Sequence, residues 1–233
     1  MRLRPFFPFY GSKWYMAPKY PRPRFRNIYE PFCGSAQYST FYCNLDIHLS
    51  DIDPVICGVW DFLIKSSERD ISSLPSLVMD RRMLPRSIPK EASDLIGFWL
   101  NPASSYPKNI RTNWADPTGR VINRYWSDWV KNRIITQQKY IRHWEISNRS
   151  YSDCPNDEGC WFIDPPYNNE DGRHYVYNQI DYRHLAIWCK IRTGQMIVCD
   201  TPSATWMDFR PLAVGRSSKS STRPTIGEGV CER

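Results

Sequence analysis

The sequence predicts an α/β protein with an open sheet, and three strand-like segments indicate this fold. An apolar strand over residues 27–32 runs into a small-residue turn at Gly34, and a helix is predicted over 37–43. A second strand over 47–50 ends at Asp51, and a third over 160–163 ends at Asp164. In open α/β sheets ligands bind beyond the carboxyl ends of the strands, so we expect the residues after these strands to form a site.

The four residues after the third strand are Asp164, Pro165, Pro166 and Tyr167. An exocyclic amine on a base is a poor nucleophile because its lone pair is delocalised, and two hydrogen-bond acceptors on its N–H groups would localise that pair. The Asp164 carboxylate and the Pro165 carbonyl can be those acceptors. The prolines fix φ and hold the turn open, and Tyr167 offers a flat face for stacking a base. The alternative is a Pro-Pro pair that merely ends a buried strand, with Tyr167 at the surface.

The turn after the first strand has features of a nucleotide-binding loop. Gly34 allows close backbone approach, and the small Ser35 and Ala36 keep the turn narrow. Asp51, at the end of the second strand, is placed where ribose hydroxyls are commonly bound. Asp53 precedes a proline and suits a helix cap, so Asp51 is the preferred ligand. An ordinary strand-to-helix connection remains the alternative.

Four motifs, in this order, make the chain resemble the Dam-type adenine-specific DNA methyltransferases. They are Phe9-Tyr10-Gly11-Ser12-Lys13, Glu30-Pro31-Phe32-Cys33-Gly34-Ser35, Asp51-Ile52-Asp53 and Asp164-Pro165-Pro166-Tyr167. The resemblance implies a Rossmann-like methyltransferase sheet with S-adenosylmethionine as the methyl donor. It also implies site-specific transfer to the N6 amine of adenine in double-stranded DNA, after the base is flipped out of the duplex.

The resemblance also assigns site residues. Catalytic residues would be Asp164, Pro165, Pro166 and Tyr167. Cofactor-binding residues would be Phe9, Tyr10, Lys13, Glu30, Phe32, Gly34, Asp51, Ile52, Tyr151 and Asp164. A loose form of the family's specificity pattern gives DNA-binding candidates at Arg111, Asn113, Arg120, Asn123 and Arg124. Two positions depart from the family: Phe9 replaces a more usual Trp or Tyr, and Ala36 replaces a second glycine, which we expect to weaken cofactor binding without abolishing it.

The motifs divide the chain into two parts. Residues 1–65 and 145–233 would form the catalytic, cofactor-binding domain, and the basic, aromatic and proline-punctuated residues 66–144 would form a small, mainly helical target-recognition insertion. Helices are predicted over 55–65, 91–100, 123–141 and 181–192, and further strands over 144–147 and 196–199. Residues 168–178 are polar and suit a loop that closes over an extruded base. The tail beyond Phe209 is rich in Ser, Thr, Gly and Arg, and we expect part of it to be disordered.

Composition agrees with a nucleic-acid partner. The net charge of +7 and pI near 9.0 favour a polyanion. The eight cysteines include no Cys-x-x-Cys pair, so neither a zinc site nor a disulfide scaffold is indicated. No signal peptide or membrane-spanning stretch is recognisable. We therefore expect a cytoplasmic monomer that binds double-stranded DNA and S-adenosylmethionine, needs no metal and does not contact a membrane.

Two alternative functions stay open. The two acceptors at Asp164 and Pro165, here called the amine clamp, suit planar amines in general. The substrate could therefore be cytosine, adenine in RNA or a glutamine side chain. The leading Asp164 and the motif order favour adenine in DNA. The second alternative is a catalytically inactive homologue that only binds nucleic acid, for which Ala36 is the motivation.

Overall fold

The computed structural model describes residues 2–102, 104–112, 125–214 and 227–233, and these residues build a seven-stranded mixed sheet. Its strands are β1 (Asn27–Glu30), β2 (Asp46–Asp51), β3 (Glu145–Asn148), β4 (Gly159–Ile163), β5 (Gly194–Asp200), β6 (Arg210–Val214) and β7 (Gly227–Glu232). The strand order is β3-β2-β1-β4-β5-β7-β6. Pairs from β3 to β5 are parallel, whereas β7 is antiparallel to both β5 and β6. The predicted α/β class is confirmed, and the first five strands have the order of a doubly wound nucleotide-binding sheet.

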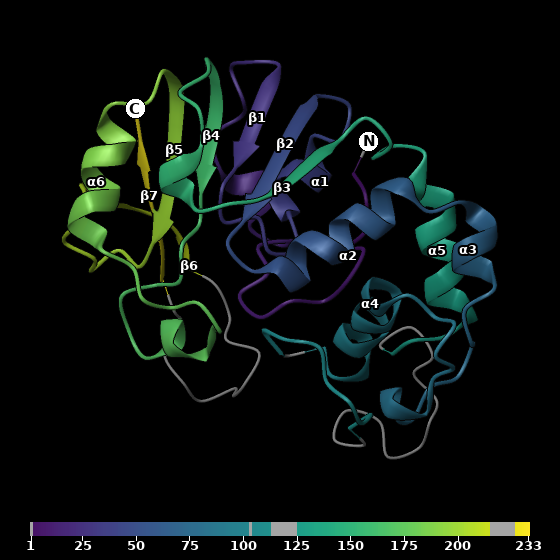
Figure 1. The fold of residues 1–233 in the computed structure, drawn as a ribbon. Helices are drawn as coiled ribbons and strands as arrows, with labels where there is room; N and C mark the ends of the chain where they lie inside the picture. Colours follow the sequence, from purple (N-terminus) through teal and green to yellow (C-terminus); the bar gives the residue numbers. More distant parts are fainter. Residues whose placement is uncertain (1, 103, 113–124, 215–226) are drawn as a thin grey trace.

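Helices lie on both sides of this sheet (Figure 1). They are α1 (Gln37–Phe41), α2 (Pro54–Lys65), α3 (Glu68–Ser72), α4 (Lys90–Leu100), α5 (Asp128–Gln138) and α6 (Tyr182–Lys190), with short 3-10 turns η1 (Ala17–Lys19), η2 (Arg81–Met83), η4 (Tyr151–Asp153) and η5 (Asp171–His174). In Figure 1, α6 lies beside the β5 end of the sheet, and α2 to α5 gather toward the β3 end.

Strand β4 shows why the sheet needs helices on both faces. All five of its residues are buried, and their side chains alternate between two apolar clusters. Cys160 and Phe162 pack in the larger cluster, which includes side chains of α1, α2 and α4. Trp161 and Ile163 pack with Leu185 of α6. Because successive side chains of a strand point to opposite faces, β4 buries one row of side chains on each side of the sheet. It lies at the centre of the layers, and its carboxyl end is at the middle of the sheet edge.

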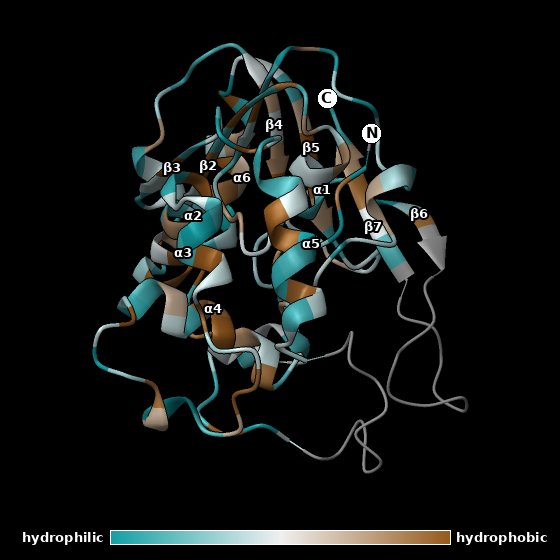
Figure 2. Cartoon of the chain, turned by 90° about the vertical axis from the view of Figure 1, so that its right-hand side faces the viewer, coloured by the Kyte–Doolittle hydropathy of each residue, from teal (hydrophilic) through white to brown (hydrophobic). Residues whose placement is uncertain are grey.

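The helices of residues 66–144 share the larger cluster with the sheet. Phe98 of α4 and Ile134 of α5 are fully buried together with Trp60 of α2 and Phe7 of the amino-terminal segment. Figure 2 shows the apolar residues of α4 and α5 as brown bands. This part of the chain thus packs directly on the α/β layers, and its part in target recognition stays a prediction.

The described parts of the tail form strands, and residues 215–226 lie outside the described residues, so partial disorder of the tail stays a prediction. Beyond Phe209, β6 and β7 add two antiparallel strands to the sheet, and Glu228 of β7 is buried. The segment has glycines at 227 and 229, which are poor strand formers, so no local signal predicts it. Its strand conformation comes from pairing with the buried edge of β5, a long-range interaction that local sequence patterns do not reveal.

None of the helices within the described residues is long and apolar enough to cross a membrane.

Candidate functional site

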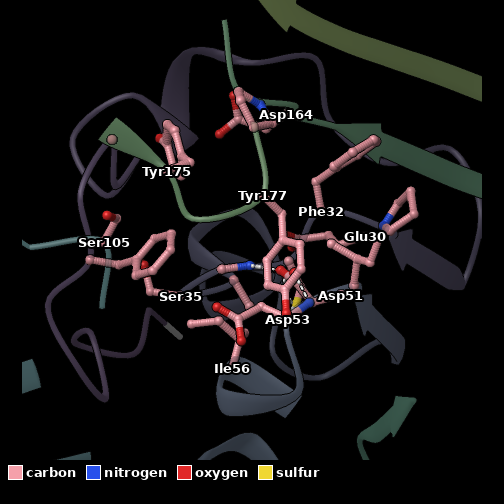
Figure 3. A pocket seen from close by; sticks show the side chains of 18 of the residues that line it. Glu30, Phe32, Ser35, Asp51, Asp53, Ile56, Ser105, Asp164, Tyr175 and Tyr177 are labelled. Carbon is pink, nitrogen blue, oxygen red and sulfur yellow. Dashed lines mark hydrogen bonds between the residues drawn. The ribbon is translucent and has the colours of Figure 1, made fainter. Parts of the chain in front are cut away.

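A cavity of about 300 Å³ lies at the carboxyl edge of the sheet, where β1 and β4 are neighbours. The chain proceeds from β1 to β2 on one side, while β4 and β5 lie on the other, so this is the switch point at which open α/β sheets bind ligands. The volume is at the lower end of the range for small-molecule sites, about 300–1,000 Å³. Figure 3 shows Asp164 on one side of the pocket and Asp51 on the other.

All ten predicted cofactor-binding residues line this one cavity: Phe9, Tyr10, Lys13, Glu30, Phe32, Gly34, Asp51, Ile52, Tyr151 and Asp164. They come from segments that are far apart in the sequence, and the fold brings them together.

The loop after β1 is held in a tight conformation by its backbone. Gly34 and Ala36 both adopt left-handed φ angles, 43° and 46°. The Gly34 amide donates to Asp51 Oδ2 at 3.0 Å, and its carbonyl accepts a hydrogen bond from Trp60 Nε1 at 2.7 Å. A Cβ on Gly34 would lie 3.0 Å from the Phe9 ring. Ala36 therefore adopts a backbone conformation in which glycine is favoured, and this conformation costs about 1 kcal/mol or more.

Asp51 links the loops after β1 and β2. Its Oδ2 accepts from Gly34, and its Oδ1 accepts from the Asp53 amide at 3.0 Å. Burial raises the pKa of the Asp51 carboxyl to about 6, against the effect of these hydrogen bonds. Asp53 is the N-cap of α2, accepting from the Val55 amide at 2.8 Å, as the sequence predicted. The Cys33 thiol also donates weakly to Asp51 Oδ2, at 3.9 Å, so a ligand hydroxyl would share this carboxylate with donors of the protein.

Aromatic rings form a flat wall next to Asp51. The rings of Phe32 and Tyr151 stack with centroids 5.3 Å apart and an interplanar angle of 29°. The Tyr151 hydroxyl is 2.8 Å from His184 Nδ1, which fixes the tyrosine ring. Ile52, 47% exposed, lies at the same side of the cavity. Such a wall suits a planar heterocycle.

Glu30 adds a buried carboxyl to the cavity lining. It is 3% exposed, and its Oε1 accepts from the Ser39 amide at 2.7 Å and also from the Ser39 hydroxyl. Burial raises the pKa of the Glu30 carboxyl to about 8, and the two hydrogen bonds from Ser39 oppose this rise. Glu30 is therefore mostly uncharged at neutral pH.

Asp164 is positioned by the end of β4, and its side chain is 21% exposed. Lys13 Nζ lies 3.2 Å from Asp164 Oδ1, although this oxygen accepts no hydrogen bond of good angle from the described residues. Burial raises the pKa of Asp164 to about 6, and the Lys13 charge opposes the rise. The carboxyl is therefore mostly ionised at neutral pH and retains acceptor capacity.

The two prolines after Asp164 are buried. The Pro166 carbonyl accepts a hydrogen bond from the Tyr182 hydroxyl. The Pro165 carbonyl accepts none within the described parts of the chain. Pro166 lines the cavity, whereas Pro165, like Tyr167, is not among the lining residues, so the structure brings only part of the predicted catalytic motif to the cavity.

Tyr167 lies beside the cavity, and the residues that line the cavity do not include it. Its hydroxyl donates to Glu228 Oε1 at 2.6 Å, and Lys13 Nζ is 4.4 Å from its ring centroid. Two other tyrosines, Tyr175 and Tyr177, do line the cavity, and Figure 3 shows Tyr177 next to Asp51. The sequence offers no motif that singles out these two tyrosines or Glu228, because all three act through long-range contacts.

Residues 168–178, here called the cover segment, pack on the amino-terminal loop. The Tyr175 hydroxyl donates to the Tyr10 carbonyl at 3.2 Å, and the Tyr175 ring centroid is 6.0 Å from that of Phe9. Gly11, with φ 72°, has no room for a side chain, since a Cβ there would lie 2.0 Å from the Tyr175 hydroxyl oxygen. The segment predicted to close over a base therefore forms part of the cavity wall.

The predicted DNA-binding residues are only partly described. Arg111 places its guanidinium 4.2 Å from the Tyr125 ring centroid and is not among the cavity-lining residues. Asn113, Arg120, Asn123 and Arg124 lie outside the described residues.

A scan against models of known protein families finds no match to this chain, and a search of curated proteins finds no similar sequence. Across the described residues, His, Cys, Asp and Glu side chains form no group of three or more that could hold a metal ion.

Proposed function

We propose that this chain is an S-adenosylmethionine-dependent methyltransferase that acts on the N6 amine of adenine in double-stranded DNA. One observation carries the proposal: the ten residues that the motif resemblance assigns to cofactor binding line a single cavity at the switch point of the sheet. A chance set of short motifs would have no reason to converge on one cavity.

The cavity has suitable groups for each part of the cofactor. The stacked Phe32 and Tyr151 rings can hold its adenine, and Asp51 can accept from its ribose hydroxyls. The loop at Gly34 lets the ligand approach the backbone closely. When bound, S-adenosylmethionine supplies a methyl group that is already activated by its attachment to a sulfonium, so the protein has to bind, align and exclude water.

Asp164 and Pro165 are the residues that would prepare the target amine. The Asp164 carboxylate and the Pro165 carbonyl can each accept one N–H of the amine, which concentrates the nitrogen lone pair on the side facing the methyl group. The amine loses one proton on methylation, and the carboxylate of Asp164 can accept it or pass it to water. Flipping the base into the cavity costs a few kcal/mol of unstacking and unpairing.

Double-stranded DNA is supported as the substrate by the net charge of +7 and by the motif order. The clamp would also accept the planar amines of cytosine, of adenine in RNA or of a glutamine side chain. A direct comparison is incubation of the purified protein and tritiated S-adenosylmethionine with DNA, RNA and a protein mixture, followed by nucleoside and amino-acid analysis. We expect label in N6-methyladenine from DNA; label only in another amine would replace adenine as the target.

Calorimetry with S-adenosylmethionine tests the cofactor separately. We expect saturable binding with one site per chain, and an Asp51→Ala variant should bind at least about tenfold more weakly if it loses the ribose contacts. Absence of binding to the wild type would favour the rival function, a nucleic-acid-binding protein that does not methylate.

A further inference from the structure

Glu228 of β7 lies at the centre of a buried polar network next to Asp164. Its Oε1 accepts hydrogen bonds from the Tyr20 hydroxyl at 2.5 Å and the Tyr167 hydroxyl at 2.6 Å, and faces Lys13 Nζ at 3.9 Å. The Glu228 side chain is 11% exposed. A carboxylate this deep in the protein is costly unless donors and a cation surround it, and here they do.

Lys13 connects Glu228 to the predicted clamp. Its ammonium, on a side chain that is 12% exposed, lies between Asp164 Oδ1 at 3.2 Å and Glu228 Oε1 at 3.9 Å. A buried ammonium with Asp164 as its sole partner would draw that carboxylate fully into an ion pair. A target amine would then have to compete with the ammonium, and leaving a buried charge unpaired is strongly unfavourable. A second carboxylate removes this conflict because Lys13 always keeps a partner.

The same oxygen also fixes Tyr167. The tyrosine hydroxyl donates to Glu228, and the ring lies against Lys13 with 4.4 Å between the centroid and Nζ. Glu228 therefore contacts both Lys13, which pairs with Asp164, and Tyr167.

We propose that Glu228 is a positioning residue of the amine clamp, which shares Lys13 with Asp164 and thereby keeps the Asp164 carboxylate available to the target amine. This inference rests on the proposed function and adds a residue from the tail of the chain to it. Glu228 acts through Lys13 and Tyr167 and does not itself contact the substrate.

Glu228→Gln tests the proposal. The amide retains an oxygen that can accept from Tyr20 and Tyr167, but it is neutral and cannot form an ion pair with Lys13. Methyl transfer should fall in kcat by about tenfold or more, while S-adenosylmethionine affinity changes less than about threefold. The matched control is Glu232→Gln, on the same strand, whose carboxylate pairs with Arg24 and Gln195 instead. It should leave kcat unchanged.

A readout independent of activity is the pKa of the Asp164 carboxyl, followed by carbon-13 NMR with Asp164→Asn for assignment. The nearby Glu228 charge raises this pKa, so Glu228→Gln should lower it, and Glu232→Gln should not. If wild-type protein transfers no methyl group but the Asp164 pKa shifts, the proposed function fails and the network stands. An unshifted pKa together with wild-type kcat in Glu228→Gln would overturn the positioning role.

Tyr167→Phe supplies a second variant if Glu228→Gln does not fold. It leaves all the charges in place and removes only the hydroxyl that Glu228 holds. We expect a lower kcat with retained cofactor affinity. Unchanged kcat in this variant would contradict the proposed constraint on the ring.

Discussion

At the scale of single residues, the loop after β1 has two left-handed positions that differ in the space around them. Gly34 faces the Phe9 ring so closely that a Cβ would lie 3.0 Å from it. Ala36 is 1% exposed and already accommodates a methyl group at a φ of 46°. Both conformation and space therefore restrict the first position to glycine, whereas at the second position conformation alone favours glycine.

The first prediction follows from this difference. Gly34→Ala should destabilise the protein by about 1–2 kcal/mol or more, because the left-handed backbone is strained and Phe9 must shift. In Ala36→Gly, relief of about 1 kcal/mol of strain is offset by the loss of a buried methyl group, about 0.8 kcal/mol, so the net change should be under about 1 kcal/mol. Urea unfolding of both variants measures the two effects. Equal stability of Gly34→Ala and wild type would show that the loop is not held as described.

The sequence identified the acids of the site because each follows a strand directly. Asp51 and Asp164 could be placed on one edge from strand ends alone, and Asp53 could be recognised as a cap from the proline after it. Tyr177 and Glu228 could not be found in this way. Their positions depend on where the chain returns after long excursions, which strand periodicity does not specify.

At the scale of elements, strands β1 to β5 can be recognised from local sequence patterns, whereas β6 and β7 depend on long-range pairing. Strands β2 and β4 were predicted to within a residue of their observed ends, because compact apolar runs end at turn or acidic residues. Strand β6 contains Pro211 and β7 contains two glycines, which disfavour strands, and the two form because β7 pairs with β5 and β6 pairs with β7. Helices α2, α4 and α6 follow the apolar periodicity and were predicted closely; α5 begins at Asp128, later than expected.

The cover segment supplies the second prediction. Tyr175 joins this segment to Phe9 and Tyr10, so Tyr175→Ala should loosen one wall of the cavity. We expect S-adenosylmethionine to dissociate about tenfold faster or more, with a smaller effect on its association rate. Stopped-flow binding measures both rates. Arg173→Ala, at an exposed residue of the same segment that is not among the cavity-lining residues, is the control and should have wild-type rates. Unaltered dissociation from Tyr175→Ala would exclude a closing role for the segment.

At the scale of the whole molecule, buried carboxyls make stability depend on pH. Burial raises the pKa of Glu30 to about 8 from the 4.5 of an ordinary glutamate, so between these values the folded protein retains a proton that the unfolded chain releases. The stabilising contribution is complete below about pH 4.5 and is lost as the pH rises through 8. The pKa values of Asp51 and Asp164 are also raised, to about 6. Their stabilising contribution is likewise present at low pH and is lost as the pH rises through 6.

The third prediction is that Glu30→Gln gains stability relative to wild type as the pH rises from 5 to 8. The difference should grow by up to about 1.4 kcal/mol per pH unit, since one proton is involved. Urea unfolding at several pH values measures it, with Glu158→Gln, an exposed position, as a control that should show no such trend. A difference that does not vary with pH would mean that Glu30 is ionised in the folded protein.

The central claim is that Asp164 prepares a DNA adenine for methylation, and it is tested most directly on a plasmid propagated in a methylation-deficient host. The host would express the wild type, Asp164→Ala or Asp208→Ala, whose side chain is 87% exposed. Sequencing that detects modified adenine should find N6-methyladenine at a recurring site with the wild type and Asp208→Ala. With Asp164→Ala it should find none. Equal modification by Asp164→Ala, or an unmodified plasmid from a wild type that binds S-adenosylmethionine, would contradict the account.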